Sequence, residues 1–100
     1  MNAVERLWRA LAAGDWAAAR AQFRSHARIE WPHTGEQIDV DEYVARARTR
    51  AQRPAASRVV AEGRCVAVEA SAGEARCAAF YDLHDGLIVS GVEYWVGEAA

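Results

Sequence analysis

Glu93 is the side chain of this 100-residue chain that could most directly move a proton. Asp85-Gly86 stands between two runs of β-branched and aromatic residues, which predicts a tight hairpin. Regular pairing across that hairpin places Glu93 in mid-strand, opposite Ala78 and diagonal to Arg76. We therefore take Glu93 as a candidate general acid or base, and Arg76 as a group that could steady negative charge. A purely structural ion pair between Arg76 and Glu93 is the alternative.

His33 is the second candidate, because it follows Pro32 in the turn after the predicted strand 26–31. An imidazole exchanges protons near neutral pH, so His33 could act on a bound ligand. An exposed turn residue without such a role is the alternative. The three histidines lie on separate predicted elements without paired spacing. The sequence therefore predicts no metal site, and we expect no cofactor.

The composition predicts one domain over residues 1–100 with a single site. Twelve basic residues stand against 14 acidic ones, for a net charge of −2, which argues against a nucleic-acid-binding surface. No apolar run approaches the roughly 18 residues of a membrane helix, so we expect a cytoplasmic protein with no membrane contact. Cys65 and Cys77 are predicted on opposite faces of a sheet, without a disulfide.

The predicted elements give an α+β fold, with helices gathered on one side of a curved antiparallel sheet. Hydrophobic periodicity and caps predict a helix over 3–13, a second that starts after Asp15 and includes Phe23, and a third that runs from Asp39 to Pro54. We interpret Arg46, Arg50 and Arg53 as a solvated face of the third helix. The predicted strands cover 26–31, 58–70, 74–83 and 87–96, with a very short one at Gln37 and Ile38.

A set of short motifs occurs in order along nearly the whole chain. They are Gly14-Asp15, Trp31-Pro32-His33-Thr34-Gly35-Glu36, and Asp85-Gly86-Leu87-Ile88 leading to Glu93-Tyr94-Trp95. Their order and spacing resemble the nuclear transport factor 2-like superfamily and, within it, SnoaL-like domains. The resemblance implies a cone-shaped, curved antiparallel sheet that wraps three N-terminal helices. It also implies an apolar cavity at the open end of the cone, often used for small hydrophobic molecules.

The resemblance also bears on one activity of the superfamily. Its ketosteroid isomerases carry their catalytic groups at places that correspond here to Trp31, Leu7 and Ala78. All three are apolar residues, so we do not expect that proton-transfer machinery. A shared fold does not by itself settle the function.

Aromatic residues are the predicted ligand contacts. The resemblance places Trp31 and Trp95 near the open end of the cone as cavity walls, with His33 at the lip. A small cone leaves little volume to fill, so several large rings should line the cavity. Core packing is the alternative for any single ring. The further candidates are Phe80, Tyr43 and Trp8.

Two functions remain open from the sequence. In the first, the chain is a binding domain that holds a small hydrophobic molecule and performs no chemistry. In the second, it is a small isomerase, cyclase or dehydratase in which Glu93 or His33 moves a proton. We favour the first, because the base position of the isomerases is Trp31.

The second face of the predicted sheet is apolar, and no predicted helix covers it. An exposed apolar face usually marks an interface, and the superfamily commonly pairs sheet to sheet. We therefore expect a homodimer through this convex face. Its predicted residues are Val66, Val68, Ala70, Cys77, Ala79, Tyr81, Ile88, Val92 and Tyr94.

Overall fold

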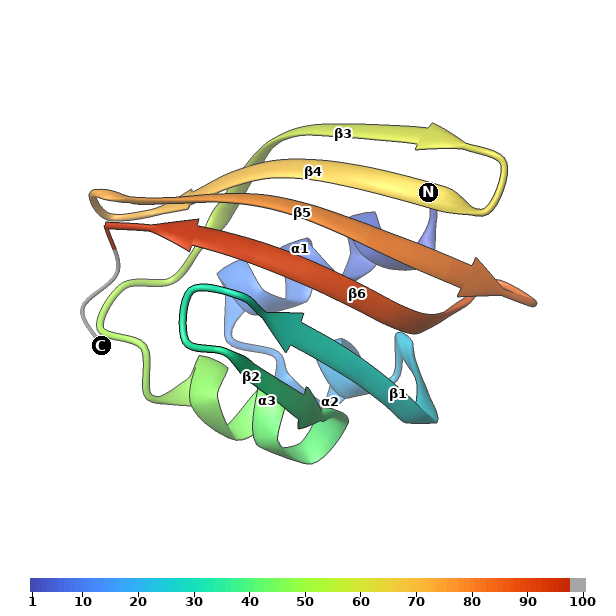
Figure 1. The fold of residues 1–100 in the computed structure, drawn as a ribbon, viewed down its shortest axis with the longest axis horizontal. Coiled ribbons are helices and arrows are strands. Elements are labelled where there is room, and N and C mark those ends of the chain that lie inside the picture. The colour runs from blue at the N-terminus through green and yellow to red at the C-terminus, as the bar shows by residue number, and fades with distance from the viewer. Residues whose placement is uncertain (98–100) are drawn as a thin grey trace.

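Three helices lie against the concave face of a curved, unclosed six-stranded sheet (Figure 1). The computed structural model describes residues 1–97. The sheet order is β2-β1-β6-β5-β4-β3, and every neighbouring pair is antiparallel except β1 and β6, which run parallel. The elements are α1 (Ala3–Ala13), α2 (Trp16–Arg20), β1 (Phe23–Trp31), β2 (Glu36–Asp39), α3 (Val40–Arg48), β3 (Ala55–Glu62), β4 (Cys65–Ala72), β5 (Ala75–His84) and β6 (Leu87–Val96).

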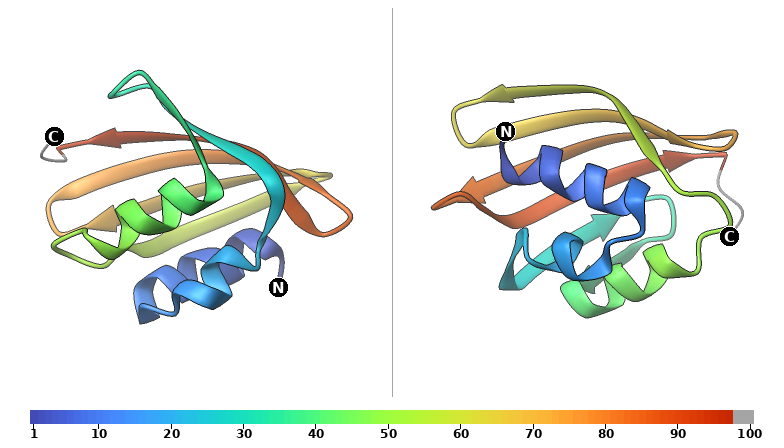
Figure 2. Two further views of the ribbon diagram at one scale, coloured as in Figure 1. Left: turned by 90° about the horizontal axis from the view of Figure 1, so that it is seen from below. Right: turned by 180° about the vertical axis from the view of Figure 1, so that it is seen from behind.

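The predicted α+β cone is confirmed. The sheet differs from the prediction in one pair, because β1 and β6 run parallel whereas the whole sheet was expected to be antiparallel. Figure 2 shows the helices beneath one face of the sheet, and no helix of the described residues covers the other face. Within residues 1–97, no helix combines the length and apolarity needed to cross a membrane.

Side-chain caps fix where the helices start, as the sequence predicts. Asn2 and Glu5 form a capping box at α1, and Asp15 accepts a hydrogen bond from the backbone N–H of Ala18 at α2. Asp39 caps α3 in the same way. The predicted span 3–13 of the first helix is confirmed.

Two predicted helix boundaries are wrong. Phe23 opens β1 instead of belonging to α2, and its side chain is buried in the core. Helix α3 ends at Arg48, well before Pro54. The Thr49 hydroxyl donates to the carbonyl of Arg46 and so satisfies one of the last helical acceptors, which ends the helix early.

The predicted strand 58–70 is in fact two strands, β3 and β4. Gly63 takes a φ of 59° between them, a left-handed conformation that reverses the chain at little cost for glycine. The C-terminal part of the sheet is therefore a four-stranded meander, not a three-stranded one.

The Asp85-Gly86 turn is confirmed, but the predicted register beyond it is wrong. Both turn residues have positive φ, and His84 pairs with Leu87. Leu83 pairs with Ile88 whereas Asp82 pairs with Ser90, so Val89 is an extra residue in β6. Such a bulge moves every later pair by one position.

The bulge reverses the predicted faces of β5 and β4. Glu93 and Trp95 point toward the helices as predicted, but they pair with Ala79 and Cys77. The prediction that Arg76, Ala78 and Phe80 face inward is wrong, since all three are exposed on the convex side. The residues that were expected on the convex face but are buried on the helix side are Val66, Val68, Ala70, Cys77, Ala79, Tyr81 and Ile88.

The two cysteines lie on opposite sides of the sheet, as predicted. Cys65 is exposed opposite Asp82 on the convex side, and Cys77 is buried opposite Ala70. These two described cysteines form no disulfide.

Candidate functional site

Glu93 is fully buried and has four side-chain donors around its carboxyl group. The indole N–H groups of Trp31 and Trp95 donate to Oε1 over 3.0 Å and 3.2 Å. The phenol groups of Tyr43 and Tyr81 donate to Oε2 over 2.7 Å and 2.5 Å. These four donors replace the hydrogen bonds that water would make to the carboxyl group and so offset the cost of burying it. The carboxyl group is thus the centre of a polar network inside an otherwise apolar core.

Four separate elements bring these side chains together. Trp31 ends β1, Tyr43 lies on α3, Tyr81 on β5, and Glu93 and Trp95 lie two apart on β6, so that they share one face. Gly91, which pairs with Tyr81, makes room for the tyrosine ring, because a Cβ there would lie 2.5 Å from the ring. We call Trp31, Tyr43, Tyr81, Glu93 and Trp95 the Glu93 network.

The two tyrosines of the Glu93 network are held as neutral donors. Burial raises the pKa of Tyr43 well above its ordinary value, and the charge of Glu93 raises it further. The pKa of Tyr81 is raised well above its ordinary value by the same two causes, burial being the larger. Both phenol groups therefore stay protonated wherever the protein is folded at moderate pH.

We expect these raised pKa values to make the fold sensitive to alkali. The unfolded chain ionises tyrosine near pH 10, roughly its ordinary pKa. The folded chain binds more protons above that pH, so the contribution of these two tyrosines to the free energy of unfolding should be constant below about pH 10 and fall above it. In a titration followed by tyrosinate absorbance and circular dichroism, two of the three tyrosines should ionise only as the chain unfolds. Ionisation of all three with the fold intact would contradict this.

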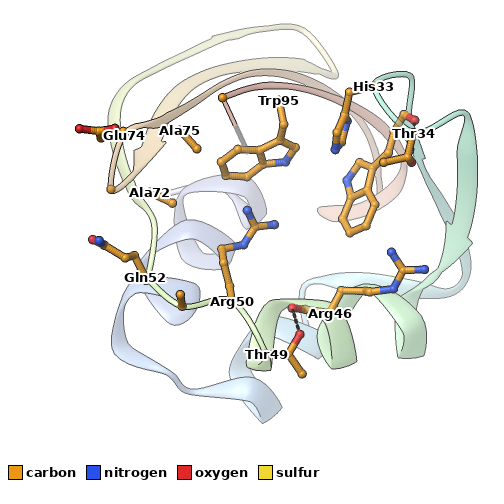
Figure 3. A pocket seen from close by; sticks show the side chains of 14 residues that line it. His33, Thr34, Arg46, Thr49, Arg50, Gln52, Ala72, Glu74, Ala75 and Trp95 are labelled. Carbon is orange, nitrogen blue, oxygen red and sulfur yellow. Dashed lines mark hydrogen bonds between the residues drawn. The ribbon is translucent and has the colours of Figure 1, made fainter. Parts of the chain in front are cut away.

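A pocket of about 610 Å³ opens next to the Glu93 network, at the wide end of the sheet (Figure 3). Its walls come from the β1–β2 turn, the end of α3 with the loop after it, the β4–β5 turn and the end of β6. Glu93 is not among the lining residues. The side chains around it include Trp31, His33, Thr34, Arg46, Thr49, Arg50, Gln52, Ala72, Glu74, Ala75 and Trp95.

Two arginines lie over the indole rings that form the inner wall of the pocket. The Cζ atom of Arg46 lies 5.5 Å from the Trp31 ring centroid, and that of Arg50 lies 4.1 Å from the Trp95 ring centroid. Both tryptophans line the pocket, yet each is only 5 % exposed. A ligand would therefore meet guanidinium groups as well as aromatic surface.

Arg46 is tied to two carboxylates at the rim. It bonds both carboxyl oxygens of Glu36 on β2, the shorter contact being 2.7 Å, and its Nε donates to Glu42 over 2.6 Å. These bonds raise the pKa of Arg46 above its ordinary value, and the bond to Arg46 lowers the pKa of Glu36. Arg46 thus joins α3 to β2 beside the pocket.

Three of the predicted site residues line the pocket: Trp31, Trp95 and His33. The His33 ring is exposed in the β1–β2 turn, 5.9 Å from the ring of Trp31. Glu93 lies directly behind the two indole rings.

The other predicted site residues lie elsewhere. Tyr43 is buried in the Glu93 network, and Trp8 supports Trp95 from the core side, with 6.3 Å between the ring centroids. Phe80 and Arg76 are exposed on the convex face, because of the bulge, so the predicted pairing of Arg76 with Glu93 is wrong.

Sequence reasoning missed Tyr81 and Arg50. The predicted register puts Tyr81 on the convex face, and no signal in the sequence marks Val89 as an extra residue. Helical spacing assigns Arg50 to the solvated face of a helix that in fact ends at Arg48, so the sequence carries no correct signal for it. Its side chain extends from the loop after α3 toward Trp95, as Figure 3 shows.

The fold and this site define a cone-shaped α+β domain with a polar network at its base. Neither a protein-family model nor a curated protein matches the sequence. Solved structures do match. A nuclear transport factor 2-like protein of unknown function from Burkholderia xenovorans LB400 has a TM-score of 0.82 and 25% identity, over 98% of this chain and 84% of that one.

Two further matches extend the comparison. A nuclear transport factor 2-like protein of unknown function from Cytophaga hutchinsonii ATCC 33406 has a TM-score of 0.79 and 16% identity, covering 94% of this chain and 87% of its own. An LEH-like epoxide hydrolase from M. tuberculosis has a TM-score of 0.69 and 20% identity, covering 94% and 80%. The chain therefore has the nuclear transport factor 2-like fold, and the resemblance predicted from the sequence is confirmed at the level of fold.

Proposed function

We propose that this chain is a binding domain that holds a small organic molecule in the pocket beside Trp31 and Trp95. The observation that carries the proposal is a preformed hollow of about 610 Å³ whose inner wall is fixed by a buried network. Ligand sites are typically concave, largely preformed and in this range of size. Apolar lining from Ala51, Ala72 and Ala75 suits the hydrophobic ligand expected from the sequence.

Blocking the pocket tests this proposal. Thr49, which directly follows α3, lines the pocket with an exposed side chain, whereas Ala45 is exposed on α3 outside the pocket. We expect Thr49→Trp to abolish binding of N-phenyl-1-naphthylamine, a neutral aromatic probe, followed by its fluorescence. Ala45→Trp should leave binding unchanged. Equal binding by both variants would place the probe elsewhere and contradict the proposal.

The catalytic alternative receives less support from the geometry. The four hydrogen bonds to the Glu93 carboxyl group come from the protein itself, and the residue has no exposed surface. A general acid or base must reach the proton that it transfers. His33 lines the pocket from an exposed turn, where water reaches the ring as readily as a ligand would. We therefore propose binding without chemistry, in the cytoplasm as expected from the composition.

We also propose that two copies of the chain pair through the convex sheet face. Apolar side chains run across four neighbouring strands in one row, Val60, Ala67, Phe80 and Val92, joined by backbone pairing. Phe80 is 47 % exposed and contacts Tyr94 edge to face. A second copy related by a two-fold axis would cover this row with the same row.

The oligomeric state tests this pairing. Light scattering at micromolar concentration should give twice the chain mass of 11.0 kDa. Phe80→Arg should give the single mass, because it puts a charge in the centre of the contact. Ala12→Arg, exposed on α1, should remain a dimer. A single mass for the unchanged protein would refute the pairing and leave the pocket proposal intact.

A further inference from the structure

We infer that a second pocket, between α1 and β3, binds a small neutral molecule through a carbonyl oxygen that accepts a hydrogen bond from the indole N–H of Trp8. The observation that carries the inference is that Trp8 lines a hollow of about 360 Å³, while its buried Nε1 has no hydrogen-bond partner within residues 1–97. The inference is independent of the proposed function, since the two pockets share no lining residue.

Helix α1 and strand β3 lie next to each other and form the two walls of this α1–β3 pocket (Figure 2). The helix presents one face, because Glu5, Trp8, Arg9 and Ala12 are spaced three or four residues apart. The strand contributes residues 55–59. Since side chains alternate along a strand, five successive lining residues bring its backbone into the wall as well. The volume is within the range typical of small-molecule sites.

The indole N–H of Trp8 is a buried donor at this pocket. The residue is only 2 % exposed, and its ring packs on Trp95 on the core side. The indole N–H groups of Trp31 and Trp95, by contrast, both donate to Glu93. A buried donor without a partner is unfavourable, so an acceptor in the α1–β3 pocket gains a hydrogen bond without displacing a protein group.

The charges around the α1–β3 pocket favour a neutral ligand. Arg9 follows Glu5 by one helical turn, and the guanidinium of Arg58 contacts the carboxylate of Glu69 over 3.4 Å. Each basic side chain at the rim therefore has an acid nearby, and exposed pairs of this kind remain hydrated. A ligand with a full charge would gain little here and would lose its own water.

The chemistry of the donor favours a carbonyl group. An indole N–H can only donate, so the ligand must supply an acceptor. A carbonyl oxygen accepts and brings no donor of its own, whereas a hydroxyl group brings an O–H that needs an acceptor in the same apolar space. The hydrocarbon part of the ligand would contact the apolar lining residues Ala12, Ala55, Ala56 and Val59.

Strand β3 is the wall that can move to admit a ligand. It is the edge of the sheet, paired only with β4, and seven of its eight residues are exposed. Its register shifts between Ala56 and Arg58, where it borders the pocket. Because few contacts hold such an edge, local opening costs little free energy. We expect a small outward movement of β3 to uncover Nε1 of Trp8, which has almost no exposed surface in the ligand-free protein.

A matched pair of probes tests the inference. Acetophenone and ethylbenzene have nearly the same shape and differ by a carbonyl group in place of a methylene group. Binding is followed through the indole signals in proton–nitrogen NMR spectra, where the Trp8 signal is identified by its loss in Trp8→Phe. We expect acetophenone to move the Trp8 N–H signal to lower field. It should bind about fivefold more tightly than ethylbenzene, as one neutral hydrogen bond would give.

Filling the pocket provides the matched variants. Ala12→Leu should weaken the acetophenone response of Trp8 at least about tenfold, because the larger side chain occupies the hollow. Ala13→Leu, exposed on α1 outside both pocket linings, should leave that response unchanged. Equal affinity for the two probes, or equal effects of the two variants, would overturn the inference.

The remaining outcomes separate the two pockets. A Trp8 signal that stays in place at saturating acetophenone, with its exchange cross peak to water retained, would show that this donor holds water only and would overturn the inference. A response confined to the signals of Trp31 and Trp95 would place the probe in the first pocket. That result would support the proposed function and would likewise overturn the inference about the α1–β3 pocket.

Discussion

Replacing Glu93 by alanine should destabilise the protein more than replacing any other member of the Glu93 network. The substitution leaves two indole N–H groups and two phenol O–H groups in the core without their acceptor. Each buried donor without a partner costs about 1–3 kcal/mol, and water that enters the new cavity recovers part of this. We expect the free energy of unfolding to fall by about 4 kcal/mol or more, a large share of the roughly 5–15 kcal/mol typical of such a domain.

Glutamine at position 93 should have a smaller effect. Its amide oxygen can still accept from the two indoles, while its NH₂ group faces two phenols that can accept as well as donate. We expect Glu93→Gln to lose about 1–3 kcal/mol. Glu69→Gln, an exposed acid on the neighbouring part of the sheet, is the control and should be neutral. Urea unfolding of the three variants measures this order, and a loss below about 1 kcal/mol for Glu93→Ala would show that the network contributes little to stability.

Replacing Gly91 by alanine should have the second-largest effect. A Cβ at this place lies 2.5 Å from Cδ1 of Tyr81 and 3.1 Å from Cδ1 of Ile29, both closer than carbon atoms pack. The Tyr81 ring must then move, which strains the core by about 1–3 kcal/mol and pulls its hydroxyl from Glu93. We expect a total loss of about 2–4 kcal/mol, estimated from these two contributions.

The sign of the change in stability distinguishes a steric clash at Gly91 from the usual effect of replacing glycine by alanine. Gly91 has no positive φ, and alanine at such places usually stabilises a protein by about 0.4–1 kcal/mol, because it restricts the unfolded chain. A double-mutant cycle with Tyr81→Ala separates the cause. If the tyrosine ring is the obstacle, Gly91→Ala should lose its effect in the Tyr81→Ala background. An unchanged loss there would assign the strain to Ile29 or to the backbone.

Local signals in the sequence are sufficient to predict several elements of the fold. Asn2 and Gly14 bound the first helix, because capping chemistry is carried by the residues themselves. Asp85 and Gly86 define the last hairpin for the same reason, and Glu93 lies on the inner face as predicted. The break at Gly63 has a signal too, since an unbroken strand over 58–70 would be about twice the usual length.

The rest depends on contacts between distant parts of the chain. Nothing near Val89 in the sequence distinguishes a bulged residue from a paired one, and a shift of one position reverses β5. That single shift exchanges Phe80 for Tyr81 in the interior and separates Arg76 from Glu93. The predicted inward orientation is therefore right for Glu93 and Trp95 on β6, and wrong for Arg76 and Phe80, which were placed through the pairing with the partner strand.

Cys65 lies exposed on the convex face, whereas the second cysteine is buried beneath the sheet. A maleimide spin label would consequently attach at one place per chain, without any engineered mutation. In a two-fold assembly the two labels would be equivalent, and a dipolar spectrum would report one distance between them. The same natural thiol would also carry a fluorophore on the side of the molecule remote from the pocket.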